Sequence, residues 1–520
     1  MKQLKVILAI LAILILLLLP MAALADTAPE STVSDGLVWG EGINGNFAHN
    51  SWYSAGRHWV MYVYGDDVIC GSSADYGATW DYIAVTSGAQ TIFRGLAVWY
   101  DEGTNLVHYA RIQQQPGNIT DGDIVYHRAG TPNAVGTITW AEAEVATEYG
   151  SSDALIGTVA ITCDRDGYPY IAWTEDEYDG GNLTGHYWVE VNDSTENDGT
   201  WIDNDAWQEF GGSDMASYGH DYDTLYGDGN WTAVAVSLVP IEGAGSARIH
   251  LAWSLLESNG TDTVGIDSTI YDQIAGWGNC SWVVPPDPTN GLFTDVMGEI
   301  AFSFYNLNTT VYCVYGDWIG DLLYNAKSGA TDWEDINGIG NWTRILDSPG
   351  YNMPAIAGYS DSGDLIVVYH DRDSLYYDTK PSGGVFTGTW TLIWDIDDHT
   401  VSPAHDIFLH NMQYRYGAGS PVGFAWDWGT LEWGNTSQSG TLSYWFIDKD
   451  GVAGGENPLG WYSSGVITST WLTVLFKTLL SIAIACGIVI GTLKFEMGWQ
   501  PKLVMIAMGL MLIAIVNSLL

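Results

Sequence analysis

Two pairs of acidic residues have the types and spacing for acid–base chemistry. Asp371 and Asp373 flank an arginine, and Glu175 directly precedes Asp176 beyond the end of a predicted strand. Glycoside hydrolysis needs two carboxyl groups that face each other across a sugar, about 5–10 Å apart. Aspartates are so numerous in this chain that turn capping is the favoured explanation of each pair. The pairs are candidates for catalysis and no more.

No group of residues has the spacing of a metal centre. Asp164–Gly167 and Asp448–Gly451 resemble the start of calcium-binding loops, but neither continues to a glutamate at the twelfth position. Tight β-turns explain both segments better. We therefore expect no cofactor, and structural calcium is left open. Nucleophile elbows and phosphate-binding loops are also absent from the sequence.

These acidic candidates come just after the second strand of a strand pair that repeats along the chain. The clearest copy is a run at 158–162, a turn at 164–167 and a run at 168–173. Five further copies are 96–99 with 106–109, 234–237 with 249–253, 300–303 with 311–315, 355–358 with 365–369, and 407–410 with 422–426. Residues 58–64 supply the second strand of an earlier copy. The sequence therefore contains seven units.

A tryptophan follows each pair, at Trp80, Trp140, Trp201, Trp277, Trp333, Trp390 and Trp461. Alternating apolar residues with frequent turn signals predict four antiparallel strands in each unit. Such a unit repeated seven times predicts an all-β chain folded as a single β-propeller, with the indole rings packed between blades. Six blades is the alternative because residues before Arg57 are hard to assign. Successive β-sandwiches are the rival architecture.

The loop in the first unit contains Ser73, Asp75, Gly77, Thr79 and Trp80 in the pattern S-x-D-x-G-x-T-W. It resembles the Asp-box of sialidase-like propellers and other BNR-repeat proteins. Weaker copies occur at 197–201, 328–333 and 387–390. In that family the Asp-box is structural and lies away from the active centre. The resemblance covers residues 26–466 and implies a fold rather than an activity.

Sialidases of that family hold a carboxylate with three arginines, and bidentate geometry makes lysine a poor substitute. The family's first arginine precedes the first Asp-box in an R-I-P type motif. Arg94 is the nearest counterpart here, but it follows the box and lacks the Ile-Pro. Three such arginines cannot be mapped onto this sequence. Sialidase activity is therefore not implied.

The two ends of the chain predict export and membrane anchoring. Residues 1–25 have the charged start, apolar run and small-residue exit of a signal peptide, with an uncleaved anchor as the alternative. Within 467–520, the segments 471–493 and 503–520 are each long enough to cross about 30 Å of hydrocarbon. The link between them carries two lysines and one glutamate, which favours the cytoplasm. We therefore expect the propeller and the C-terminus outside the cell.

Acidic residues dominate the composition, with 62 Asp and Glu against 17 Lys and Arg. This charge argues against nucleic acid and anionic lipid as ligands. Four cysteines precede the anchor, and we expect Cys280 to pair with Cys313 unless they are simply buried apolar residues. Asn-x-Ser/Thr triplets occur in excess of chance and indicate a glycoprotein. They are Asn118, Asn182, Asn192, Asn230, Asn259, Asn279, Asn308, Asn341 and Asn435.

These features predict a non-catalytic module at a cell or virion surface that recognises a glycan or a protein. Exposed aromatic residues would stack on sugars or pack on a partner, and the bilayer would hold the anchor. A membrane-tethered glycoside hydrolase or lyase of the sialidase-like class is the alternative. For that alternative the candidate residues are Arg94, Glu175, Asp371 and Asp373.

Overall fold

The structure of the protein is a computed structural model. The structure describes residues 31–37, 49–64, 67–75, 77, 79–86, 91–114, 123–148, 154–179, 182–194, 200–201, 208–210, 231–241, 246–257, 264–284, 302–316, 321–328, 342–347, 353–359, 362–370, 374–395, 406–409, 415–416, 422–429, 440–447 and 453–454. None of these residues belongs to a helix that could cross a bilayer. The predicted signal peptide and both predicted membrane segments lie outside the described residues.

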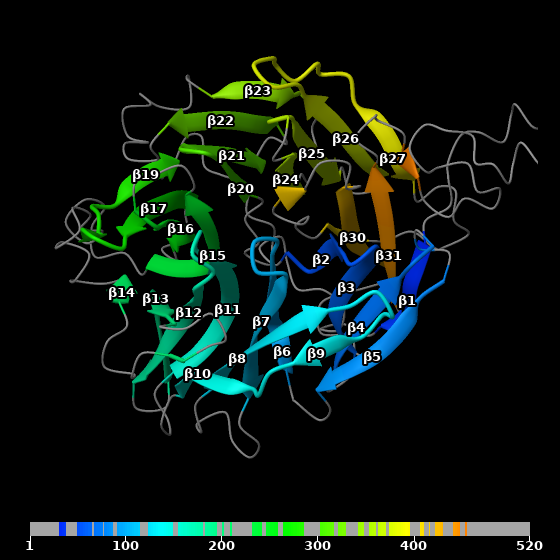
Figure 1. The fold of residues 1–520 in the computed structure, drawn as a ribbon. Helices are drawn as coiled ribbons and strands as arrows, with labels where there is room; N and C mark the ends of the chain where they lie inside the picture. The colour runs from blue at the N-terminus through cyan, green and yellow to red at the C-terminus, as the bar shows by residue number, and fades with distance from the viewer. Residues whose placement is uncertain are drawn as a thin grey trace, which may run out of the picture.

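The described strands form seven sheets around a central axis (Figure 1). Sheet 1 contains β2 (Ser51–Ser54), β3 (Arg57–Tyr64), β4 (Asp67–Ser73) and β5 (Asp81–Thr86). Sheet 2 contains β6 (Thr91–Asp101), β7 (Leu106–Gln114), β8 (Asp123–Pro132), β9 (Ile138–Trp140) and β10 (Glu144–Glu148). Sheet 3 contains β11 (Ala154–Cys163), β12 (Pro169–Asp179), β13 (Asn182–Asp193) and β14 (Gln208–Phe210).

The remaining sheets repeat this order. Sheet 4 contains β15 (Trp231–Ile241), β16 (Arg248–Glu257), β17 (Val264–Asp272), β18 (Gly276–Trp277) and β19 (Ser281–Val284). Sheet 5 contains β20 (Phe302–Leu307), β21 (Thr310–Gly316), β22 (Leu322–Ser328) and β23 (Thr343–Leu346). Sheet 6 contains β24 (Met353–Tyr359), β25 (Leu365–His370), β26 (Ser374–Lys380), β27 (Thr391–Asp395) and β29 (Arg415–Tyr416). Sheet 7 contains β28 (Asp406–Leu409), β30 (Val422–Gly429), β31 (Gly440–Ile447), β1 (Ser31–Leu37) and β32 (Ala453–Gly454).

Strand β1 joins the two ends of the ring. It pairs antiparallel with β31, from Ser31 opposite Tyr444 to Leu37 opposite Gly440. The last sheet is therefore completed by the first described strand, which ties the two ends of the ring together. The prediction of an all-β, single β-propeller is confirmed, and separate β-sandwiches are excluded for the described residues.

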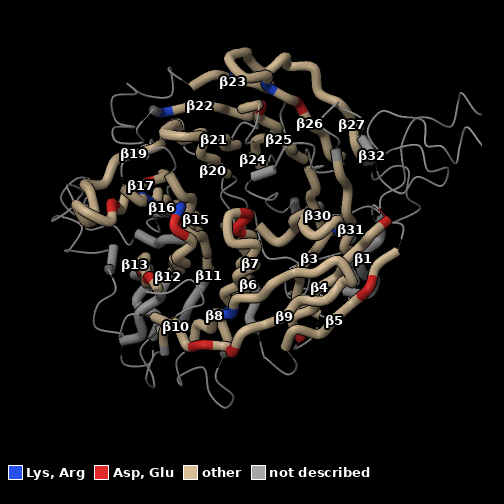
Figure 2. Tube along the Cα trace, viewed as in Figure 1, with Lys and Arg blue, Asp and Glu red and all other residues tan. Residues whose placement is uncertain are grey.

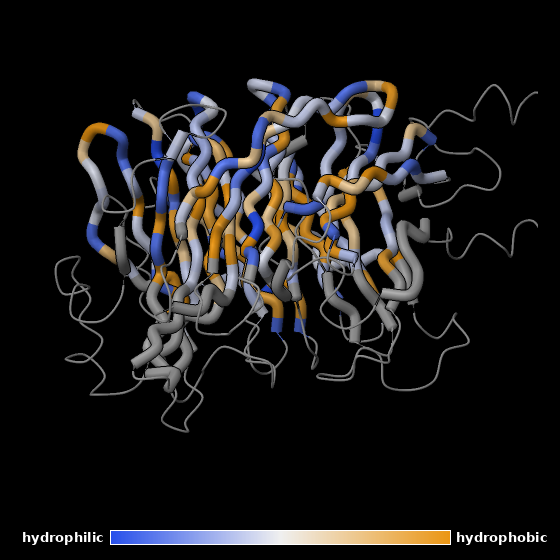
Figure 3. The backbone as a smooth tube through the Cα atoms, turned by 90° about the horizontal axis from the view of Figure 1, so that it is seen from below, coloured by the Kyte–Doolittle hydropathy of each residue, from blue (hydrophilic) through white to orange (hydrophobic). Residues whose placement is uncertain are grey.

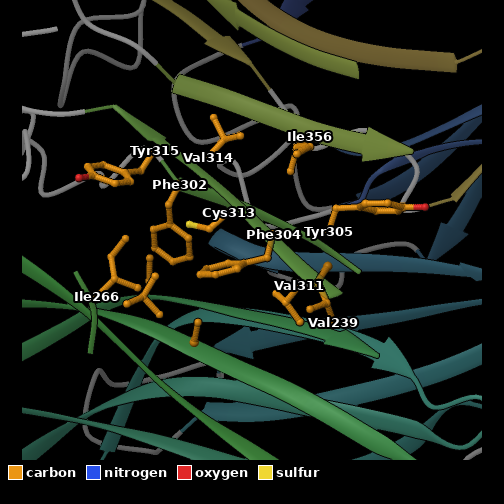
Figure 4. Close-up of a cluster of buried hydrophobic side chains, with 14 of the residues drawn as sticks. Val239, Ile266, Phe302, Phe304, Tyr305, Val311, Cys313, Val314, Tyr315 and Ile356 are labelled. Atoms are coloured by element: carbon orange, nitrogen blue, oxygen red, sulfur yellow. The ribbon is translucent and has the colours of Figure 1, made fainter. Parts of the chain in front are cut away.

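The hydrophobic core lies between neighbouring sheets. Both faces of each inner strand pair are covered, so the second strands are apolar along most of their length, as in β25, where all six residues are buried. Figure 4 shows one such contact: Phe302, Phe304 and Cys313 of sheet 5 pack against Ile266 of sheet 4. The order of strands in each sheet also aligns the described turns, which lie along one edge of the molecule (Figure 3). We call this the turn edge; the other edge is the loop edge, where second strands end.

The predicted pairing of Cys280 with Cys313 was wrong, and the alternative of buried apolar residues is confirmed. Cys70, Cys163, Cys280 and Cys313 are all free and buried. Cys280 packs in the cluster between sheets 3 and 4, whereas Cys313 packs in a different cluster with Phe302 and Val311. Each sulfur therefore fills a small apolar space in the core.

The periodic tryptophans pack where the repeat predicts, as far as they are described. Trp80 of sheet 1 contacts the edge of Tyr444 in sheet 7, with ring centroids 5.3 Å apart. Trp390 of sheet 6 contacts Tyr369 of its own sheet and donates from Nε1 to the Ile345 carbonyl of sheet 5 at 3.4 Å. Such rings extend the apolar contact between sheets toward the outer strands. Trp333 and Trp461 lie outside the described residues.

Candidate functional site

One residue of each second strand faces the preceding sheet near the loop edge, and we call this place the wedge position. The wedge residues are Tyr62, Arg111, Trp173, Trp253, Tyr315, Tyr369 and Trp426. All seven are buried. Strand register supports the alignment: Arg111 lies opposite Leu96 and Trp173 opposite Val159, in each case beside an irregularity of the innermost strand.

Six wedge residues are aromatic, and Arg111 is the exception. Trp173 packs with Ala97 and Ile112 of sheet 2, which gives the position its usual role of filling the space between sheets. Along β7, Val107 and Tyr109 share the face of Arg111 because side chains alternate, and both pack against sheet 1. An aromatic ring is therefore replaced by a guanidinium in the space between sheets 1 and 2.

Arg111 contacts two neighbouring side chains of sheet 2. Its Nη1 donates to Oε1 of Gln113 at 2.7 Å, and its guanidinium carbon lies 4.3 Å from the centroid of the Tyr126 ring. Tyr109 lies on the same face of sheet 2 as Arg111. We call Arg111, Gln113, Tyr126 and Tyr109 the Arg111 cluster. Burial lowers the pKa of Arg111, although the neighbouring Tyr109 and Tyr126 act in the opposite direction. The side chain is only 7% exposed, so its charge is held largely out of water.

A second arginine borders the cluster. Arg128 donates from Nε to the Ala141 carbonyl at 2.7 Å and from Nη1 to the Val85 carbonyl of sheet 1 at 3.3 Å. Burial raises the pKa of the Tyr109 hydroxyl, and the two positively charged arginines partly offset that rise. The Tyr109 oxygen is buried beside both arginines. Two cations and a phenol therefore meet in one inter-sheet space.

This arrangement suits recognition of an anion. A guanidinium presents paired N–H donors that match a carboxylate, and the interaction strengthens when water is excluded. Acidic positions are distributed round the ring (Figure 2). Two other arginines bind carboxylates: Arg57 binds Asp81 at 2.6 Å and Arg248 binds Asp272 at 2.6 Å. Arg111 and Arg128 bring two guanidinium groups to the space between sheets 1 and 2.

Of the candidate catalytic residues predicted from the sequence, only Arg94 and Glu175 are in described strands, and both lie toward the loop edge. Arg94 is in the irregular part of β6 between Thr91 and Leu96, and Glu175 is opposite Ile156 near the end of β12. The side chains of Arg94 and Glu175 are not described. Asp371 and Asp373 lie outside the described residues, and no catalytic pair is brought together among the described side chains. Arg111 was missed as a site residue, yet it is the one break in the aromatic end of the repeated second strand.

The loop Ser73–Trp80 is held by its own polar side chains at the turn edge. Asp75 accepts hydrogen bonds from the Thr79 backbone at 2.9 Å and the Thr79 hydroxyl at 2.7 Å. Ser73 Oγ donates to Asp75 at 2.8 Å and accepts from the Gly77 backbone at 2.7 Å. Gly77 has a φ of 90°, a conformation that disfavours other residues. These bonds give the loop a structural role far along the strands from Arg111.

A comparable arrangement occurs in sheet 6. Asp378 accepts from the Thr387 hydroxyl and from the Gly388 backbone, both at 3.0 Å. The turn at Asp164–Gly167 is also closed locally, because Asp164 Oδ1 accepts from the backbones of Asp166 and Tyr168. No group of three or more His, Cys, Asp or Glu residues suited to a metal ion occurs among the described residues.

The asparagine side chains of the predicted glycosylation triplets differ in exposure. Asn279 and Asn308 are exposed, and Asn308 sits in the turn between β20 and β21 with a φ of 56°. Asn192 is 2% exposed and donates to the Ala146 carbonyl at 2.8 Å. Its amide is therefore inaccessible in the folded protein. Asn182 starts β13, without a described side chain, and the other five triplets lie outside the described residues.

No protein-family model matches the sequence, and no curated protein matches it. Similar solved structures include a lectin from Burkholderia pseudomallei, with 13% identity over 81% of this chain and 99% of that chain and a TM-score of 0.47. A polysaccharide lyase has 9% identity over 81% and 99%, with a TM-score of 0.42. An intramolecular trans-sialidase from Ruminococcus gnavus has 10% identity over 82% and 99%, with a TM-score of 0.37. Likeness at this level carries no conclusion about ligand or activity.

Proposed function

We propose that this chain is an exported, membrane-anchored β-propeller that recognises a carboxylate-bearing glycan or protein segment between sheets 1 and 2. One observation carries the proposal: Arg111 occupies the wedge position, which is aromatic in the six other sheets. Burying a guanidinium costs free energy, whereas an aromatic side chain at this place adds apolar burial. A charged side chain where six other sheets place an aromatic ring favours a binding role for this space.

Two arginines offset the overall acidic charge of the chain in the space between sheets 1 and 2. The chain carries far more acidic than basic residues, so its general field repels anions. An anionic ligand therefore needs a local concentration of positive charge, and Arg111 with Arg128 supplies one. Tyr109 and Tyr126 beside the guanidinium add flat apolar surfaces on which a sugar ring can pack.

The membrane part of the proposal rests on the sequence. Cleavage after residue 25 would release the propeller outside the cell, and segments 471–493 and 503–520 would hold it on the bilayer. The basic link between them would remain in the cytoplasm and the C-terminus would be outside. Protease protection of tagged full-length protein in sealed vesicles tests this topology.

Binding is tested with the full chain in lipid nanodiscs. Oligogalacturonate and sialyl-oligosaccharides are titrated beside their methyl esters, which keep the shape and lose the charge. We expect binding of at least one acid form and loss of that binding for the ester and for Arg111→Ala. Arg165→Ala removes the same charge from a turn at the turn edge and should bind like wild type. Binding by acid and ester alike, or by Arg111→Ala as by wild type, would reject the carboxylate proposal.

A glycoside hydrolase is the second candidate, and the repeat gives it one specific observation. Glu175 follows Trp173 by two residues and Asp371 follows Tyr369 by two, which is the spacing of Gln113 after Arg111. Two carboxylates thus occupy the same place of the repeat in different sheets. Turnover of chromogenic glycosides by the full chain, abolished in Glu175→Gln and in Asp371→Asn, would establish this candidate in place of a binding module.

A further inference from the structure

Three loops on the turn edge present bare aliphatic side chains to solvent. Val135 is 79% exposed, Ile274 is 84% exposed and Val385 is 76% exposed. Each belongs to the connection that follows the third strand of its sheet: β8 in sheet 2, β17 in sheet 4 and β26 in sheet 6. The three residues therefore lie at equivalent places round the ring, and we call them the apolar tips.

The tips are held outward by hydrogen-bonded turns. Asn133 Oδ1 accepts from the Val135 backbone at 3.1 Å and from the Thr137 backbone at 3.2 Å. Asp272 Oδ1 accepts from the Ile274 backbone at 2.9 Å, while its Oδ2 is fixed by Arg248. These bonds prevent the loops from collapsing to cover the apolar side chains. A single exposed aliphatic residue is ordinary, but three fixed at one place of the repeat form a pattern.

The Val385 loop is fixed in a similar way. The Gly384 backbone donates to the Pro381 carbonyl at 2.8 Å, and the Ser382 backbone donates to Asp364 at 2.7 Å. The described turns of Figure 3 share one edge, so the tips of sheets 2, 4 and 6 point the same way along the axis. Together they define a plane across the ring rather than a patch on one sheet.

The last described residues of the chain lie at this same edge. Strand β31 is the third strand of sheet 7, so it ends at Ile447 on the turn edge, and β32 pairs there with Phe446 and Ile447. Sixteen residues separate Gly454 from the predicted membrane segment that starts at Trp471. A tether of this length that starts at the turn edge allows the apolar tips to face the surface in which the chain is anchored.

We infer that the apolar tips rest on the bilayer and that the loop edge, with Arg111 near it, faces away from the membrane. This inference rests on the proposed membrane anchor. Three aliphatic side chains add contact at the interface without spanning it. The turn edge also carries Asp101 and Glu102, so the contact suits a zwitterionic lipid surface and is weakened by anionic lipid.

The test uses the full chain in phosphatidylcholine nanodiscs with an environment-sensitive fluorophore at one introduced cysteine. The tip variants are Val135→Cys, Ile274→Cys and Val385→Cys. Tyr64→Cys is the matched control, because Tyr64 is 45% exposed at the end of β3 on the loop edge. The four described cysteines are buried, and the labelled unsubstituted chain gives the background from Cys486.

We expect the three tip probes to shift to the blue and to be quenched by spin-labelled lipid, with no quenching at position 64. Phosphatidylserine in the disc should reduce the quenching. Quenching equal at tips and control, or at neither, overturns the inference, as does a tip signal that appears only with two chains per disc. Alkaline carbonate treatment of membranes tests the anchor separately. Release of the chain by carbonate would refute the membrane anchor, whatever the quenching of the tips.

Discussion

Arg111 on β7 holds the place in sheet 2 that Trp173 on β12 holds in sheet 3. Both face the preceding sheet, and both lie opposite the innermost strand beside an irregularity in its pairing. Trp173 is completely buried and fills the space between sheets, whereas Arg111 brings a charge into the equivalent space. The fold therefore accommodates an aromatic ring at this place in sheet 3 and a guanidinium in sheet 2.

The loop that contains Asp75 should contribute measurably to stability. Asp75→Ala removes the acceptor of two Thr79 donors and of Ser73, which should lower the free energy of unfolding by about 1–2 kcal/mol. Asp166→Ala serves as the control, because the Asp166 carboxylate makes only a 3.7 Å contact with the neighbouring Arg165. Urea unfolding of both variants gives the comparison. Equal effects would mean that the loop bonds do not stabilise the fold.

Acid should destabilise the protein through its buried histidines. Burial lowers the pKa of His58 and of His250 to about 3, so both stay neutral in the folded state. The unfolded chain binds a proton at each below pH 6.5. Stability due to each histidine is therefore complete above pH 6.5 and is lost toward pH 3, at about 1.4 kcal/mol per pH unit.

His250→Phe isolates one of these contributions. The ring stays apolar beside Phe304, whose centroid lies 5.0 Å away. Burial raises the pKa of Asp164, which acts with the opposite sign, but that contribution is shared by both proteins and cancels in their difference. We expect the unfolding midpoint of His250→Phe to depend less steeply on pH between 6.5 and 4. A slope identical to wild type would show that His250 is protonated in the fold.

Exposure should decide which acceptor asparagines carry glycans. Asn308 and Asn279 are exposed, whereas the Asn192 amide is buried against the Ala146 carbonyl. Peptide mapping of protein from a glycosylating host should find glycans at Asn308 and Asn279 and none at Asn192. Asn192→Gln should lower the melting temperature without changing the mass of the glycan. A glycan on Asn192 would contradict the burial.

All described cysteines should be thiols. Cys280 and Cys313 lie in different apolar clusters, and burial raises the pKa of Cys313 well above its ordinary value. The unfolded chain should therefore give the same thiol count with and without prior reduction. A count that rises by two after reduction would restore the disulfide expected from the sequence.

The sequence predicted the ring because its evidence is local and periodic. An aromatic residue such as Trp173, Trp253 or Trp426 recurs at the same place of the second strand, and the apolar run around it indicates burial. The pairing of β1 with β31 joins residues at opposite ends of the propeller, and no local pattern near Ser31 reports it. The membrane segments remain predictions of hydropathy.

Individual sites were predicted less well because they depend on neighbours in other sheets. The triplet at Asn192 has the right letters, yet its side chain points into a buried contact with sheet 2. Cys280 and Cys313 are close in sequence, but they pack in different clusters of the core. Arg111 differs from the aromatic residue that the repeat has at this place. The strand register is needed to align Arg111 with Trp173, and the sequence alone does not supply it.

Arg111, in the proposed function, serves binding at the expense of stability. Arg111→Tyr restores the residue class of the other six wedge positions. Its unfolding in nanodiscs should therefore require about 1–2 kcal/mol more free energy than wild type. The same sample should no longer bind the acidic oligosaccharide that wild type binds. A less stable Arg111→Tyr protein that still binds that ligand would contradict the account.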